Sequence, residues 1–210
     1  MKYLYFRKSN FSLDEIEKRL QDKLKSENFI FKEVYRQENK FLVYGIVFPE
    51  MIEEFVKLDL QLLAFYPLNI FVINQENEII IGVFNPEIIT TILNEYNSNY
   101  QKFVDFENKI KEIVDEISGG EKRKIESIKL YATTTCPYCA QEKAFLDSNN
   151  IKYDYVLVDI NPIAAEEMIK KTGQQGVPVT EIIYNDGDSD FIIGFDRQRL
   201  TRIIKELKES

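Results

Sequence analysis

The segment TTTCPYC, residues 133–139, contains both cysteines of the chain, at positions 136 and 139. Residues 125–131 before it have the pattern of a strand, and residues 137–146 after it have a helical pattern with Pro137 in the first turn. Cys136 is therefore expected at a helix N-terminus, where unpaired backbone amides and the helix dipole stabilise a thiolate. Cys139 follows one turn later on the same side, in position to attack a mixed disulfide formed at Cys136.

Two cysteines separated by two residues also occur in zinc sites, so the rest of the chain has to be considered. Tetrahedral zinc needs three or four protein ligands, and this chain has no histidine and no third cysteine. A zinc site would need carboxylates or a second chain, and we predict no metal. The lack of histidine also excludes a Cys–His or Ser–His–Asp mechanism. Because a disulfide that closes so small a loop stabilises a fold only slightly, the pair is predicted to be redox-active.

The chain has 210 residues, which is enough for two small domains. Two glycines, Gly119 and Gly120, follow a long helical pattern and precede a charged tract, as at a helix end followed by a linker. We therefore predict one domain at residues 1–118, a linker at residues 119–124 and a second domain at residues 125–210. The basic run at residues 122–124 is interpreted as a solvated linker or strand edge and not as a functional patch.

The charge balance bears on the partners and the location of the protein. The chain has 27 Lys and Arg against 35 Asp and Glu, a formal net charge of −8, which argues against binding to nucleic acid. No window has the roughly 18 uncharged apolar residues that a membrane span needs, and the start of the chain has no apolar stretch of signal-peptide length. We expect a cytoplasmic protein without a nucleic-acid or membrane partner.

The first half alternates between strand-like and helical patterns. Ser12 and Glu15 form the pattern of a capping box at the start of a helix. Strands are expected at 2–7, 29–36, 41–48, 68–74 and 78–84, and helices after Ser12, at 50–58, from Asn85-Pro86, and up to residue 117. This pattern predicts a two-layer α+β domain. It contains no catalytic constellation.

Residues 60–74, LQLLAFYPLNIFVIN, and the following residues 78–86 carry a family resemblance. Together with the order of elements, they resemble the family known as domain of unknown function 302, over roughly residues 10–117. That family has no settled activity. The resemblance therefore implies a fold, and suggests a homodimer formed through the N-terminal domain.

The second half continues with a strand at 151–158 and a helix at 162–171, and ends with a strand at 191–194 and a helix at 196–208. Between them stands Gly-Val-Pro-Val at 176–179. A proline between two valines at the start of a strand is explained by a cis Val177–Pro178 peptide bond, the alternative being a trans proline on an edge strand.

Residues 125–208 resemble a glutaredoxin, with the CPYC motif, Gly-Val-Pro and Ile-Gly-Phe-Asp at 193–196 in the expected order. The resemblance implies a thioredoxin fold, βαβαββα, and a disulfide oxidoreductase with Cys136 as nucleophile and Cys139 as resolving thiol. Val177 would offer backbone hydrogen bonds to a bound peptide or to glutathione. Asp196 matches the position that meets the γ-glutamyl end of glutathione. The implied substrate-binding residues are Tyr138, Val177, Pro178, Gly194, Phe195 and Asp196.

The electron donor is less clearly indicated. Many glutathione-using members have Lys or Arg where this chain has Thr133, and residues 173–179 with Gly194-Phe195 are similar to redoxins that take electrons from thioredoxin reductase. The expected partners are disulfide-bearing proteins and either glutathione or thioredoxin reductase, with no tightly bound cofactor. Two alternatives remain: a partner- or ligand-binding protein whose redox domain is a sensor, and an iron–sulfur cluster carrier that uses Cys136 and glutathione.

Overall fold

The structure is a computed structural model that describes residues 4–58, 63, 66–75, 78–85 and 100–209. The helix expected from Asn85-Pro86 lies outside these residues. Contacts within the chain divide it between Lys122 and Arg123 into two compact units, each with its own sheet. Of the helices described, none combines the length and the apolar character needed to span a membrane.

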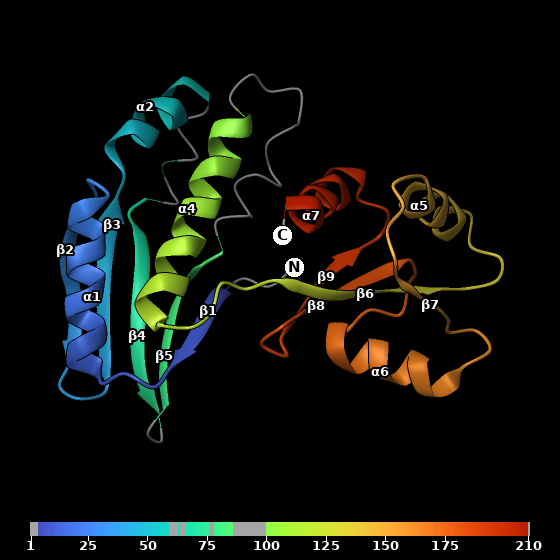
Figure 1. The fold of residues 1–210 in the computed structure, drawn as a ribbon, viewed down its shortest axis with the longest axis horizontal. Coiled ribbons are helices and arrows are strands. Elements are labelled where there is room, and N and C mark those ends of the chain that lie inside the picture. Colours follow the sequence, from blue (N-terminus) through green and yellow to red (C-terminus); the bar gives the residue numbers. More distant parts are fainter. Residues whose placement is uncertain (1–3, 59–62, 64–65, 76–77, 86–99, 210) are drawn as a thin grey trace. The chain divides into compact units, whose positions relative to one another are not determined.

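The first unit is a mixed α/β structure around a five-stranded antiparallel sheet in the order β1-β5-β4-β3-β2 (Figure 1). Strands β4 and β5 pair antiparallel, and β1 pairs with β5 along its other side. The described elements are β1 (Leu4–Ser9), α1 (Leu13–Ser26), β2 (Ile30–Gln37), β3 (Phe41–Val47), α2 (Pro49–Leu58), β4 (Leu68–Gln75), β5 (Glu78–Phe84) and α4 (Tyr100–Ser118).

Helices α1 and α4 cover one face of this sheet (Figure 1). The apolar side chains between these helices and the sheet form the hydrophobic core of the first unit. The predicted capping box is present, because the Ser12 side chain accepts from the backbone of Glu15 and the Glu15 carboxylate accepts from the backbone of Ser12. The helical spacing then turns Ile16, Leu20 and Leu24 into the core, where they are fully buried. The two-layer arrangement expected from the sequence is confirmed.

The second unit has a four-stranded sheet in the order β7-β6-β8-β9, in which β7 runs parallel to β6 and the other pairs are antiparallel. Helices α5 and α7 lie on one face of the sheet and α6 lies on the other (Figure 1). This is the predicted thioredoxin fold. The elements are β6 (Ile125–Ala132), α5 (Pro137–Ser148), β7 (Asp154–Leu157), α6 (Pro162–Thr172), β8 (Val179–Tyr184), β9 (Ser189–Ile193) and α7 (Arg197–Glu209).

Strand β8 separates the two faces of this sheet residue by residue. Thr180 and Ile182 face the α5 side, where Thr180 bonds to a side chain of α5 and Ile182 packs in the core shared with α5 and α7. Val179 and Glu181 face α6, where Val179 packs and Glu181 pairs with a lysine. Every residue of β8 except Ile183 is buried. Because successive side chains of β8 point to opposite faces, only those on the α5 side lie on the same face of the sheet as the helix that carries the cysteines.

The basic run at residues 122–124 is not uniformly solvated, so the interpretation as a solvated linker is wrong for Arg123. Its guanidinium pairs with Asp186 and Asp188 at 2.8 and 2.9 Å, and its central carbon lies 4.7 Å from the centre of the Tyr184 ring. Only 12% of its side chain is exposed. The backbone of Lys124 also bonds to residue 185 in both directions. Arg123 is thus part of the second unit.

Candidate active site

The two cysteines lie at the start of α5, immediately after the loop that follows β6. Cys136 is the N-cap residue of the helix, Pro137 occupies the first turn, and the Cys136 sulfur accepts a hydrogen bond from the backbone amide of Cys139 at 3.1 Å. The two residues are joined in a disulfide, with their Cα atoms 5.3 Å apart. Cys139 is fully buried, whereas Cys136 is partly exposed. The residue predicted to be the nucleophile is therefore the one that a substrate can reach.

The loop before β8 lies next to this sulfur. The Val177–Pro178 peptide bond is cis, as the sequence predicts. The carbonyl oxygen of Val177 is 3.8 Å from the Cys136 sulfur, and the carbonyl oxygen of Pro178 accepts a hydrogen bond from the Gly194 amide at 2.9 Å. These contacts bring three of the predicted substrate-binding residues to the N-terminus of α5.

The other predicted substrate-binding residues have distinct environments. Tyr138, in the first turn of α5, is 64% exposed. Phe195 is partly buried and packs against Phe145, with ring centroids 5.9 Å apart. The Asp196 carboxylate accepts from the backbone amide of Arg199 at 3.0 Å and so caps the first turn of α7. Tyr138 thus presents an open side chain, while Phe195 and Asp196 contribute to the fold itself.

The sequence analysis missed a polar clasp between the loop before α5 and the end of β7. The backbone amide and the hydroxyl of Thr134 both donate to one oxygen of Asp159, at 2.9 and 2.6 Å. These two bonds lower the pKa of Asp159, which stays a carboxylate and holds the loop. The position of Asp159 directly after a strand that runs parallel to β6 was the available signal, because the ends of parallel neighbours meet.

A second missed residue is Glu142, in α5. It has no exposed surface, and one of its carboxyl oxygens accepts a hydrogen bond from the Thr180 hydroxyl. Burial raises the pKa of Glu142 to about 7, and the negative charge of Asp196 acts in the same direction. Glu142 follows Cys139 by three residues, and this helical spacing could have identified it as a neighbour on the buried face.

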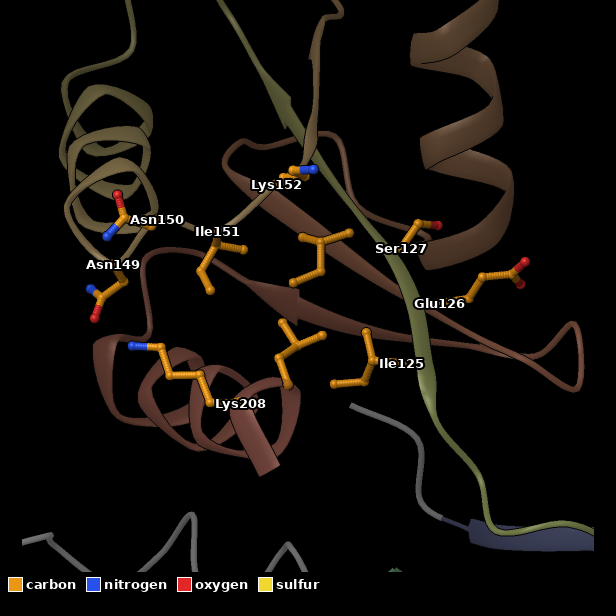
Figure 2. Close-up of a pocket in the computed structure, with 10 residues that line it drawn as sticks. Ile125, Glu126, Ser127, Asn149, Asn150, Ile151, Lys152 and Lys208 are labelled. Carbon is orange, nitrogen blue, oxygen red and sulfur yellow. The ribbon is translucent and has the colours of Figure 1, made fainter. Parts of the chain in front are cut away.

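A pocket of about 400 Å³ lies in the same unit but away from the cysteines (Figure 2). Its walls come from the first residues of β6, the segment after α5 and the end of α7. Cys136 follows the opposite end of β6, so this pocket is not part of the candidate site. Its lining residues are Ile125, Glu126, Ser127, Ile128, Asn149, Asn150, Ile151, Lys152, Leu207 and Lys208.

Comparison with known proteins places this site in a family. Residues 128–185 match the family model described as Glutaredoxin. An uncharacterized glutaredoxin-like 8.6 kDa protein in the rubredoxin operon of Clostridium pasteurianum is 37% identical over 79 residues, which are 38% of this chain and 99% of that protein. The chain belongs to the glutaredoxin family. It does so through its second unit, which carries the cysteines.

Two further similarities complete the comparison. Glutaredoxin 3 of Escherichia coli K12 is 38% identical over 52 residues, which cover 25% of this glutaredoxin-family chain and 63% of that protein. A solved structure described as an uncharacterized conserved protein DUF302 from Bacillus stearothermophilus is 16% identical, with a TM-score of 0.47. It covers 56% of this chain and 99% of its own length.

Proposed function

We propose that the second unit is a thiol–disulfide oxidoreductase in which Cys136 is the nucleophile and Cys139 is the resolving thiol. One observation carries this proposal: the sulfur of Cys136 accepts a hydrogen bond from the Cys139 amide at the N-terminus of α5, and Cys136 is the partly exposed residue of the pair. An amide hydrogen bond and the positive end of a helix both stabilise negative charge on sulfur. A thiolate is the attacking species in disulfide exchange.

The reaction has two exchange steps. The Cys136 thiolate attacks one sulfur of a substrate disulfide, a bond forms between them, and the other substrate sulfur leaves as a thiolate that takes a proton from water. Cys139 then attacks the Cys136 sulfur and displaces the second substrate thiol. Two electrons have passed to the substrate, and the enzyme holds the Cys136–Cys139 bridge seen in the structure.

The substrate class follows from the surroundings of Cys136. A substrate sulfur bonded to Cys136 would lie beside the Val177 backbone, which suits an extended peptide or glutathione. The exposed ring of Tyr138 offers apolar contact area next to it. We therefore propose that the substrates are protein disulfides and mixed disulfides with glutathione, with Asp196 near the γ-glutamyl end of glutathione.

The proposal is tested by the consumption of NADPH with a small disulfide substrate, using either glutathione with glutathione reductase or thioredoxin reductase alone. The family potential of roughly −200 to −230 mV allows a glutathione pool to reduce the bridge. Turnover only with glutathione identifies a glutathione-dependent enzyme, and turnover only with thioredoxin reductase identifies a redoxin in which Thr133 reflects weak glutathione binding. Cys136→Ser should be inactive in both systems. The absence of wild-type turnover in both would overturn the proposal.

A further inference from the structure

The proposed reaction leaves one proton without an assigned acceptor. Cys139 has to lose its thiol proton before it can attack the mixed disulfide. Cys139 has no exposed surface, so solvent does not reach its thiol in the folded protein. An acceptor inside the fold is therefore needed.

Glu142 is placed to be this acceptor. It lies three residues after Cys139 in α5, and side chains with this spacing are neighbours on one face, with Cβ atoms about 5–6 Å apart. Both residues are fully buried on the face of α5 that packs on the sheet. The Glu142 side chain and the Cys139 sulfur thus belong to the same buried face of α5.

One of the two carboxyl oxygens of Glu142 is available. Oε1 accepts from the Thr180 hydroxyl, whereas Oε2 is buried and has no hydrogen-bond partner among the residues that the structure describes. A buried polar atom without a partner is costly and calls for an explanation. The Cys139 sulfur is oxidised in the structure, and in the reduced enzyme its thiol proton would give this oxygen a partner.

We propose that Glu142 accepts the proton of the Cys139 thiol as Cys139 attacks the mixed disulfide. This step rests on the proposed function. The proton moves from the Cys139 sulfur to Oε2, and the freed electron pair forms the bond to the Cys136 sulfur. The bond between Cys136 and the substrate sulfur breaks, and the substrate leaves as a thiolate that is protonated by solvent. When the bridge is reduced again, Glu142 returns the proton to Cys139.

The electrostatic surroundings suit this exchange. Burial raises the pKa of Glu142 to about 7, Asp196 acts in the same direction, and the hydrogen bond from Thr180 acts against both. A group that titrates near neutral pH can accept a proton in one step and return it in another. The neighbouring buried carboxylate, Glu181, belongs to the opposite face of β8 and bonds to Lys171 and Tyr131.

The test separates the two exchange steps in time. Reduced full-length protein is mixed with an equimolar aromatic disulfide, dithiobis(nitrobenzoate), which releases a coloured thiolate when Cys136 attacks and a second one when Cys139 resolves the intermediate. Glu142→Gln should leave the first phase unchanged and slow the second about 100-fold at neutral pH, the lower range for a positioned proton acceptor. A plot of the rate of the second phase against pH should show an inflection near pH 7 for the wild type and none for this variant.

Three further variants make the result specific. Glu181→Gln, which alters an equally buried carboxyl on the other face, should leave both phases unchanged. Thr180→Val removes the hydrogen bond that lowers the pKa of Glu142, so the inflection should move to higher pH, whereas Thr180→Ser should keep it in place. A purely structural role of Glu142 would not move the pH profile in this way.

Each outcome is decisive. A second phase in Glu142→Gln with the wild-type rate and pH profile would overturn the role of Glu142 and leave disulfide exchange intact. If that variant does not fold, an unshifted inflection in Thr180→Val overturns the role instead. Release of a single coloured equivalent by the wild-type protein would overturn both this role and the resolving function of Cys139.

Discussion

The burial of Glu142 should make the stability of the oxidised second unit depend on pH. Its carboxyl has a pKa of about 7 in the folded protein against an ordinary value of 4.5. Below pH 4.5 the carboxyl is protonated in both the folded and the unfolded protein and does not lower the free energy of unfolding. Between pH 4.5 and 7 only the unfolded state ionises, so stability falls as pH rises. At about 1.4 kcal/mol for each pH unit, the full cost above pH 7 is about 3 kcal/mol.

Glu142→Gln isolates this contribution. The buried amide of the variant lacks an acceptor for its N–H groups, which costs about 1–3 kcal/mol at every pH. This offset does not change with pH, so the informative quantity is the difference in the free energy of unfolding between variant and wild type. That difference should shift in favour of the variant by about 3 kcal/mol between pH 4.5 and pH 8.

The assay is urea unfolding of the oxidised full chain at several pH values, followed by far-ultraviolet circular dichroism. The transition of the second unit is recognised because a reducing agent shifts it. Glu181→Gln is the control: burial opposes ionisation of Glu181, but hydrogen bonds from Lys171 and Tyr131 lower its pKa, so its stabilising effect is lost as pH falls. The difference in the free energy of unfolding between Glu142→Gln and wild type could instead stay constant within about 1 kcal/mol from pH 4.5 to pH 8. That result would refute the idea that Glu142 is a buried carboxyl whose ionised form is poorly compensated.

Three other predictions concern the cysteines, the start of the second unit and the turn after β9. Cys139→Ser should retain removal of glutathione from mixed disulfides and lose reduction of protein disulfides in the NADPH-coupled assay; full activity toward protein disulfides would contradict the assigned roles. Arg123→Ala should lower the unfolding free energy of the second unit by about 1–2 kcal/mol, because one guanidinium pairs with two aspartates and covers Tyr184; no change would show these contacts to be neutral. Gly194→Ala should cost about 1–2 kcal/mol, because the φ of 77° is strained for alanine while nothing crowds its side chain; Gly194→Asn should cost less, and equal costs would point to another cause.

Local rules in the sequence were sufficient for much of the fold. The capping box at Ser12 forms because its two hydrogen bonds involve residues only three apart. The cis Val177–Pro178 bond could be anticipated because the proline stands between two valines where a strand begins. The second cis bond, Tyr66–Pro67, also directly precedes a strand, but there the preceding residues did not have the pattern of a strand and no cis bond was predicted.

The residues that were missed depend on contacts between distant segments. Arg123 looked like part of a solvated basic run, and its environment is set by Asp186 and Asp188 in a turn more than 60 positions later. Glu142 precedes Lys143, and such a pair reads as an exposed surface of a helix. Glu142 is buried because the face of α5 that carries Cys139 packs against the sheet. The charge pattern alone does not reveal which face of the helix is buried.

The contrast between the two buried glutamates of the second unit, Glu142 and Glu181, explains why only one of them is suited to proton transfer. Glu181 meets Lys171 at 2.8 Å and the Tyr131 hydroxyl at 2.9 Å, and these donors hold it as a carboxylate despite burial. Glu142 has a single neutral donor, Thr180, and feels the like charge of Asp196, so its ionised form is poorly compensated. A permanently charged, fully bonded group has neither a proton to give nor an open site to receive one. The alternation of β8 turns Glu181 toward α6 and turns Thr180 toward Glu142, which α5 holds on the same face as Cys139. The strand therefore separates a structural ion pair on one face of the sheet from a group able to exchange protons at neutral pH on the other.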